Sequence, residues 1–195
     1  MNKHINNYFK ELNKINKLID QNQILKLVKL LVKIRSDRGR IFFLGVGGSA
    51  ANCSHAVNDF RKLCNIESYC PTDNVSELTA RINDESWEKS LSEWLKISKL
   101  RKKDCLFIMS VGGGNLEKNV SINLINAIDY GLKKQCNILG IAGRDGGYVS
   151  KKSKFVCVIP NTNLNLTTPL TESYQAVVWH CIVSHPLMQV NATKW

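Results

Sequence analysis

Short apolar segments alternate with helical patterns along most of the chain, and this alternation limits the possible folds. The first such segment, "RIFFLGV" at residues 40–46, is almost entirely apolar and lies beside glycines. A parallel strand that is covered by helices on both faces has this composition, because neither face meets water. Further strands are predicted at 67–70, 104–111, 137–143 and 154–160, and helices near 50–64, 74–82, 86–100, 117–134, 146–152 and 168–187. The sequence therefore predicts an α/β fold, a doubly wound five-stranded parallel sheet with helices on both faces.

Two N-terminal helices are predicted before the first strand. Apolar residues recur at helical spacing from Ile5 to about Arg35, with a break at the "DQNQ" segment. Between residues 24 and 34 they cover more than one helix face, which is more than a contact with one sheet uses. We therefore expect residues 1–36 to be a helical extension with contacts to another subunit, and residues 37–195 to be the main domain.

The composition indicates a globular protein of the cytoplasm. Hydrophobic residues make up 44% of the 195 residues, and no apolar run approaches the roughly 20 residues that span a bilayer. The N-terminus lacks the pattern of a signal peptide, so we expect no membrane partner. Seven cysteines occur without any C-x-x-C pair and several lie in apolar segments, so we expect them to be reduced core residues.

The net charge of +11 is concentrated at the start of the chain. Residues 1–40 hold ten Lys and Arg against three Asp and Glu, so most of the excess belongs to the N-terminal helices. A solvated helix face explains such an excess, and so does attraction of an anionic substrate. Nucleic acid is not an expected partner, because no recognition-helix, RRM or OB pattern is present.

Two glycine-rich loops follow the first and third predicted strands, "GVGGSA" at 45–50 and "SVGGGN" at 110–115. In a sheet of order 2-1-3-4-5 these loops flank the crevice where ligands bind. Glycines allow a close approach of the backbone, and the helix that follows offers free N–H groups to a phosphate. The first loop alone is equally well explained as a tight turn with Ser49 as the helix N-cap. Three consecutive glycines in the second exceed what a turn needs, so together the loops favour ligand binding.

Candidate acid, base and metal-binding groups follow the first loop and recur near the C-terminus. His55 and Asp59 are four residues apart, so they share a helix face and can meet one ligand, or simply form a surface ion pair. Residues 144–147, "RDGG", are interpreted as a turn, with contact to a ligand in the assembled oligomer as the alternative. His185 before Pro186 is interpreted as the end of a helix.

Taken together, several segments resemble one family in their order and spacing: "GVGGSAANCSHAVNDF", "RIND", "SVGGGN", "NILGIAGRDGGYVSKKSKFVCVIP" and "TESYQAVVWH". They are similar to the SIS (sugar isomerase) domain, in particular to the phosphoheptose isomerases. The resemblance implies a flavodoxin-like sugar-phosphate-binding domain and a homotetramer that carries Zn²⁺, one ion per subunit. It implies an aldose–ketose isomerase that converts sedoheptulose 7-phosphate to D-glycero-D-manno-heptose 7-phosphate, for nucleotide-activated heptose and surface glycans.

The resemblance also implies site residues. The substrate would contact Val46, Gly47, Gly48, Ser49, Asp59, Asn83, Asp84, Ser110, Val111, Gly112, Gly113, Gly114, Asn115 and Glu172. The metal ligands would be His55, Asp59, Glu172 and His180, and Asp59, Glu172 and His180 would carry the catalysis. Such groups fit the reaction, because isomerisation needs a proton carrier and stabilisation of the enediol oxygens.

Three departures from the family pattern concern this site. The family's phosphate loop is rich in Ser and Thr, whereas this chain has "SVGGGN". Asp59 stands where the family has Glu, and Glu172 where it has Gln. A second hypothesis is therefore a non-catalytic SIS module that binds a sugar phosphate or a partner protein, like the replication-initiator-associated members of the family.

Overall fold

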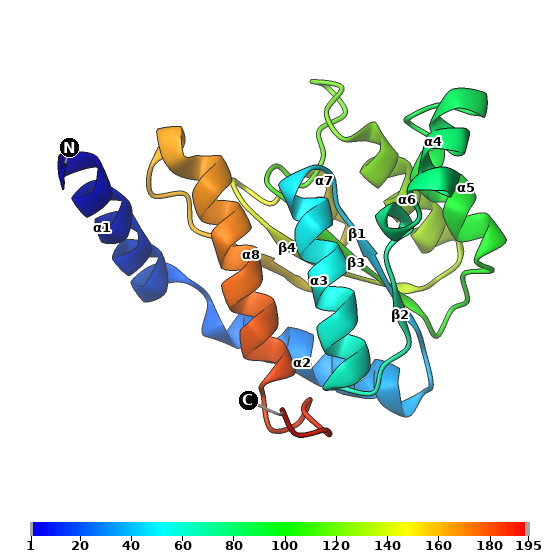
Figure 1. Ribbon diagram of the computed structural model, residues 1–195, viewed down its shortest axis with the longest axis horizontal. Helices are drawn as coiled ribbons and strands as arrows, with labels where there is room; N and C mark the ends of the chain where they lie inside the picture. Colours follow the sequence, from blue (N-terminus) through cyan, green and yellow to red (C-terminus); the bar gives the residue numbers. More distant parts are fainter. Residues whose placement is uncertain (1, 194–195) are drawn as a thin grey trace.

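The structure is a computed structural model, and it describes residues 2–193. Five parallel strands form one sheet of order β2-β1-β3-β4-β5 (Figure 1). The strands are β1 (Ile41–Leu44), β2 (Ser68–Tyr69), β3 (Cys105–Ser110), β4 (Asn137–Ala142) and β5 (Val156–Val158). Each lies within a segment predicted to be a strand, and the predicted α/β class and strand order are confirmed.

Eight α-helices and two 3₁₀ turns complete the described part of the chain. They are α1 (Asn2–Leu18), α2 (Gln21–Ser36), α3 (Gly48–Lys62), η1 (Pro71–Asp73), α4 (Val75–Asp84), α5 (Ser90–Ile97), α6 (Ile122–Lys133), α7 (Gly147–Lys152), η2 (Leu164–Leu166) and α8 (Thr167–Val183). The helix expected near 117–134 begins only at Ile122, because residues 115–121 form a loop closed by an antiparallel bridge between Asn115 and Val120. The last helix ends at Val183, four residues earlier than expected.

Helices cover both faces of the sheet, and each face has its own apolar core. Phe43 points into the core formed with α2, α3 and α8, whereas its neighbour Phe42 points into the core formed with α5 and α6. Side chains of neighbouring strand residues lie on opposite faces, so one apolar pair serves both cores. The continuous apolar character of "RIFFLGV" is explained by this double burial.

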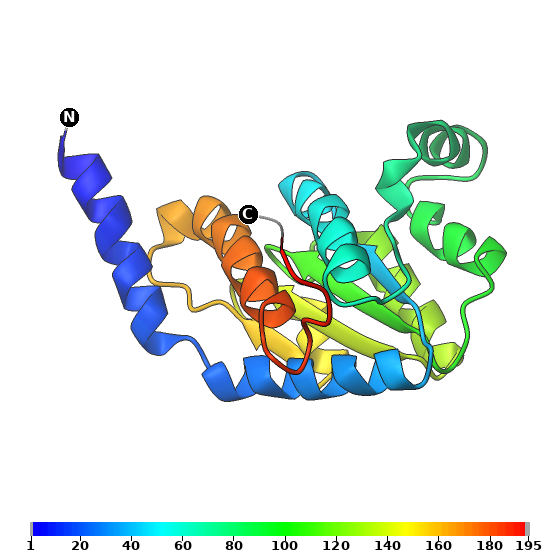
Figure 2. The same ribbon diagram turned by 60° about the horizontal axis from the view of Figure 1, so that its bottom comes forward.

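The N-terminal helices have different environments. Four residues of α2 belong to the core shared with α3 and α8: Leu27, Val28, Leu31 and Ile34. In contrast only Glu11 and Ile15 of α1 are buried, the start of this helix projects from the body (Figure 2), and its Phe9 is 61% exposed. The break between the two helices lies at Asp20, whose carboxylate accepts a hydrogen bond from the Gln23 N–H and caps α2. The division of the chain at residue 36 stays a prediction, since α2 is part of the main core.

All seven cysteines are unpaired and six are buried, as expected; Cys181 is exposed. Within residues 2–193, no helix is long and apolar enough to cross a membrane.

Candidate functional site

A cleft of about 710 Å³ opens at the carboxyl edge of the sheet, where the loops after β1 and β3 meet. Seven of the predicted substrate-binding residues line it: Val46, Ser49, Ser110, Val111, Gly112, Gly114 and Asn115. Eight further lining residues are Lys118, Val120, Ser121, Arg144, Asp145, Gly147, Asn161 and Thr168. The cleft therefore lies between the two strands at which the strand order reverses, where the topology predicts a ligand.

The first glycine loop leads directly into α3. Gly47 is the N-cap of α3 with a φ of 63°, and no side chain among the described residues caps this helix end. Ser49 lies inside the helix instead, where its Oγ accepts a hydrogen bond of 3.0 Å from Gln175 Nε2. The alternative of Ser49 as N-cap is thus wrong, and the first-turn amides of α3 remain without a side-chain partner beside the cleft.

The second glycine loop is shaped by its contact with the turn after β4. A Cβ atom on Gly113 would overlap with the carbonyl oxygen of Gly146, and one on Gly147 would overlap with that of Gly112. The N–H groups of Tyr148 and Val149 donate to the Gly114 and Gly113 carbonyls at 2.9 and 3.0 Å. Gly113 of the three consecutive glycines is therefore required for packing between the loops, a reason that the sequence pattern did not indicate.

Two cationic side chains line the cleft, and neither was predicted as a site residue. Lys118 lies on the 115–121 loop, and Arg144 lies in the turn after β4 with a φ of 54°. Neither side chain makes a hydrogen bond or ion pair with any residue from 2 to 193. Asp145, the one acidic residue of the lining, accepts a hydrogen bond from the Gly147 N–H. The "RDGG" segment is thus a turn, as interpreted, and it also supplies a cation to the cleft.

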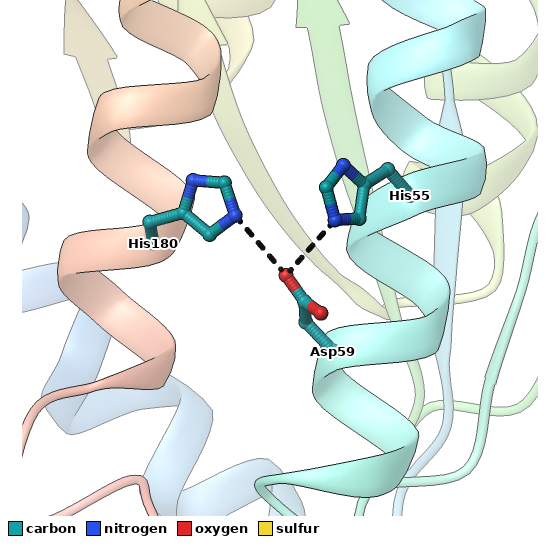
Figure 3. Close-up of side chains that lie close together, drawn as sticks. All are labelled: His55, Asp59 and His180. Carbon is teal, nitrogen blue, oxygen red and sulfur yellow. Dashed lines mark ion pairs between the residues drawn. The ribbon is translucent and has the colours of Figure 1, made fainter. Parts of the chain in front are cut away.

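A second group of functional side chains lies between α3 and α8 (Figure 3). Oδ2 of Asp59 lies 3.7 Å from Nε2 of His55 and 3.4 Å from Nε2 of His180. The two imidazoles are about half exposed, at 55% and 52%, whereas the Asp59 side chain is 11% exposed. Three predicted metal ligands thus converge, and their ligand atoms all lie within 4.8 Å of one another.

Glu172, the fourth predicted ligand, does not join this group. It lies on the same continuous helix as His180, eight residues earlier, and at 1.5 Å per residue this separation is about 12 Å. Its carboxylate lies instead over the start of α3, where a Cβ on Gly48 would be 2.6 Å from both oxygens. The expected convergence of four ligands is corrected to three, because α8 does not bend between the two positions.

A polar network joins α3 and α8 between the cleft and the histidines. Nδ2 of Asn52 donates to the Glu172 carbonyl at 2.9 Å and to Oε1 of Gln175 at 2.8 Å. Gln175 is fully buried and donates in turn to Ser49. Asn52 could have been found from the sequence, because it lies three residues before His55 on the same helix face.

The remaining predicted residues lie outside both sites. Asn83 and Asp84 are exposed at the end of α4, where the Asn83 amide donates to the Asp84 carboxylate at 2.8 Å. Three predicted glycines, Gly47, Gly48 and Gly113, adjoin the cleft without lining it. The structure therefore does not bring residues 83–84 to the cleft, although their segment matched the family pattern.

Comparison with known proteins agrees with the fold and the motifs. The SIS domain family matches residues 7–143. The chain belongs to this family. Relatives of this SIS-domain protein include "Probable phosphoheptose isomerase" of Thermoplasma volcanium, 26% identical over 185 residues that cover 92% of this chain and 89% of the relative. Phosphoheptose isomerase of Aliarcobacter butzleri is 26% identical over 175 residues, which cover 87% of this chain and 84% of the relative.

The solved structure of phosphoheptose isomerase GmhA from Neisseria gonorrhoeae has the same fold as this SIS-domain protein. The two superpose with a TM-score of 0.79 over 92% of this chain and 93% of the other, at 21% sequence identity. The family resemblance drawn from the motifs is thereby confirmed.

Proposed function

We propose that this SIS-domain protein is an aldose–ketose isomerase that converts sedoheptulose 7-phosphate to D-glycero-D-manno-heptose 7-phosphate. The observation that carries the proposal is the group of His55, Asp59 and His180 beside a cleft suited to a phosphate. The relatives named phosphoheptose isomerases support it, since they align over most of this chain and of their own length.

The phosphate end of the substrate binds in the cleft. Lys118 and Arg144 supply positive charge there, and the free amides at the start of α3 supply hydrogen-bond donors. Ser110 is the one hydroxyl of the second glycine loop, and its Oγ accepts from the Gly113 N–H at 3.0 Å. Cationic side chains thus bind the phosphate in place of the hydroxyls of the family's Ser- and Thr-rich loop.

The sugar end extends along α3 toward the histidines. From Ser49 to His55 the helix rises by roughly 9 Å, a span that an extended heptose phosphate can cover. The Glu172 carboxylate lies over Gly48 on this path. A substrate anchored by its phosphate therefore reaches Glu172 first and the histidine group next.

The histidine group is suited to hold a divalent cation. Ligand atoms on a tetrahedron with metal–ligand bonds of about 2.0–2.1 Å lie about 3.4 Å apart. The two N···O distances of 3.4 and 3.7 Å are close to this spacing, and all three ligand atoms lie within 4.8 Å of one another. Imidazole and carboxylate are donors that Zn²⁺ accepts. Three protein ligands leave a fourth position open, as in catalytic zinc sites. Bound there, the ion would polarise the carbonyl and hydroxyl oxygens of the sugar.

Proton transfer is assigned to the carboxylate outside that group. Glu172 removes the proton from the carbon next to the carbonyl and returns it to the carbonyl carbon, while the hydroxyl proton of the first carbon passes to the former carbonyl oxygen. A cation held by His55, Asp59 and His180 would stabilise the negative charge that develops on the enediol oxygens. This division assigns Asp59 and His180 to holding the cation and Glu172 to the proton, so variants can separate the two roles.

The enzyme is a homotetramer of the cytoplasm under this proposal. Exposed apolar residues on α1, namely Ile5, Phe9 and Leu18, support self-association. An apolar groove of about 480 Å³ between α2 and α8 adds to this surface; its lining includes Ile24, Leu25 and Val177. Seven unpaired thiols suit a reducing compartment.

The test is turnover of sedoheptulose 7-phosphate in deuterated water, followed by NMR, with metal content measured in parallel. Glu172→Gln is expected to abolish turnover and deuterium incorporation but to retain bound metal. His180→Ala is expected to lose both turnover and metal. Glu88→Gln and His4→Ala, at exposed positions outside both sites, are the matched controls. Binding of the sugar phosphate without turnover in the wild type would favour the non-catalytic SIS module instead.

A further inference from the structure

The edge of the sheet opposite the cleft carries the whole net charge of the protein. Five segments lead into the amino ends of the strands: 33–40, 65–67, 96–104, 133–136 and 151–155. They hold fourteen Lys and Arg and three Asp and Glu, a net charge of +11, which equals that of the full chain. The remaining residues hold thirteen of each sign. We call these five segments the basic edge; α2, which leads into the first of them, lies along the lower side of the sheet in Figure 1.

Contacts between the segments hold the basic edge together. Arg40 donates to the carboxylate of Asp104 at 2.7 Å and to the carbonyls of Ser98 and Lys99 at 3.1 and 2.9 Å. A shallow hollow of about 590 Å³ connects the end of α2 with the segments before β3 and β4; its lining is Lys33, Asp37, Arg101, Lys102, Lys103, Gln135 and Asn137. The charges of segments 33–40, 96–104 and 133–136 are therefore gathered around one hollow.

The acidic residues of the basic edge are already engaged. Asp104 is fully buried and pairs with both Arg40 and Arg101, and Asp37 pairs with Lys33. Six exposed cationic side chains make no hydrogen bond or ion pair with residues 2–193: Arg38, Lys99, Lys102, Lys103, Lys133 and Lys151. Like charges at this density repel one another, so an anionic partner from outside the chain is favoured.

Apolar side chains within this surface narrow the choice of partner. Ile97 is 71% exposed between Lys96 and Lys99, and Leu132 is 38% exposed beside Lys133. Exposed apolar side chains among lysines are typical of proteins that lie on anionic lipid, where apolar and electrostatic contributions add. A second copy of this chain carries the same positive edge and would repel it. Phe155 is the one aromatic residue of the five segments and packs against the core, so a platform for nucleobases is missing there.

We propose that the basic edge binds the anionic surface of a lipid bilayer, with Ile97 and Leu132 entering the headgroup layer. The cleft opens at the carboxyl edge, so it faces away from the lipid and stays accessible to a soluble sugar phosphate. This surface is independent of the proposed isomerase activity. It departs from the expectation of no membrane partner, which rested on the lack of a spanning segment.

The experiment is sedimentation of the full chain with vesicles that contain about 30 mol% phosphatidylglycerol in phosphatidylcholine. The protein is expected to sediment with these vesicles, to stay in solution with pure phosphatidylcholine, and to be released at about 0.5 M salt, where the Debye length is only a few ångströms. Lys102→Glu with Lys103→Glu is expected to raise the lipid concentration for half-maximal binding at least about tenfold. Ile97→Ser is expected to weaken binding without changing the salt dependence.

A matched control distinguishes the effect of the basic edge on lipid binding from the effect of net charge alone. Lys3→Glu with Lys17→Glu makes the same charge change on exposed positions of α1 and is expected to leave lipid binding within about twofold. An equal loss in this control, no binding to anionic vesicles, or full binding by Ile97→Ser would each overturn the proposal. If the wild type bound duplex DNA, and Ile97→Ser bound it with the same affinity, a nucleic acid would be identified as the partner instead. Thermal unfolding of each variant verifies that it is folded.

Discussion

The indole Nε1 of Trp179 donates a hydrogen bond of 3.1 Å to Oδ2 of Asp59, the same oxygen that faces His55 and His180. Trp179 is 1% exposed, so this bond is shielded from water and fixes the carboxylate in one orientation. Partners of metal ligands commonly change the metal affinity by about 10–100-fold when they are removed. Trp179 is therefore a positioning residue for the proposed metal group.

Trp179→Phe is expected to lower the affinity for Zn²⁺ by roughly tenfold or more, because the Asp59 carboxylate loses its orienting donor. Competition with a chromophoric chelator measures the affinity. Trp94→Phe is the matched control, since this indole packs against Phe42 on the other face of the sheet. Both variants lose stability, but only the first is expected to lose metal affinity. Equal affinities in the two variants would contradict the role of Trp179.

Asp59→Asn is expected to abolish metal binding while leaving the fold intact. The amide oxygen still accepts the hydrogen bond from Trp179, so the packing between α3 and α8 is kept, whereas the negative charge is lost. Metal content after dialysis, together with the thermal midpoint, measures the two effects. Retention of one ion per subunit would show that the cation is held elsewhere.

Local patterns explain why the fold could be predicted and the site only in part. Strands such as β1 are short segments buried on both faces, so their apolar character is visible without knowledge of their neighbours. The pairing of His55 with Asp59 is equally local, because a helix brings residues four apart to one face. His180 entered through the family resemblance alone, since nothing local shows that α8 lies beside α3.

Glu172 and the basic edge show what the sequence does not reveal. The family resemblance implied Glu172 in the metal group, but α8 is one continuous helix and places Glu172 about 12 Å along the helix from His180. Counting charge along the chain assigned the excess to residues 1–40, whereas the parallel topology gathers segments up to residue 155 at one edge. The first correction depends on the continuity of α8 between two residues eight positions apart, and the second on the relative position of segments far apart in the sequence.

Gly113→Ala is expected to destabilise the fold more than Gly47→Ala. Both glycines have a positive φ, which costs about 1–2 kcal/mol for alanine. At Gly113 the added Cβ also overlaps with the carbonyl oxygen of Gly146. At Gly47 no atom lies within 4 Å of the added Cβ. Urea unfolding of both variants measures the difference. Equal losses would contradict the tight packing between the two loops.

Asp104 is expected to make stability depend on pH below about 4. Burial raises the pKa of this carboxyl, but hydrogen bonds from Arg40 and Arg101 lower it more, to about 2. Since the folded pKa lies below the unfolded value of about 3.9, the stabilisation is present above pH 4 and is lost as the pH falls toward 2. It amounts to about 2 kcal/mol at neutral pH. The stability difference between wild type and Asp104→Asn should therefore shrink from pH 5 to pH 2; a constant difference would contradict the shift.

Phe9→Asp is expected to dissociate the proposed tetramer. Phe9 is 61% exposed on α1, so a charge there costs little in a monomer but much in an apolar interface. Light scattering at micromolar concentration measures the mass. Val75→Asp on α4, an equally exposed apolar position, is the control. A wild-type monomer would refute the tetramer itself.

Lys118 and Arg144 are expected to bind the phosphate of the substrate without taking part in proton transfer. Both line the cleft, and neither has a partner among residues 2–193 that would compete with a ligand. Hydrogen bonds to charged groups contribute about 1.5–3 kcal/mol, so Lys118→Gln and Arg144→Gln should each raise KM by about tenfold or more. The kcat value should stay within about threefold, because the contact is equally strong in the ground and transition states. Lys29→Gln, an exposed lysine of α2, is the control. A fall in kcat at unchanged KM would show that these residues act at the reacting carbons. It would overturn the assignment of the cleft to the phosphate.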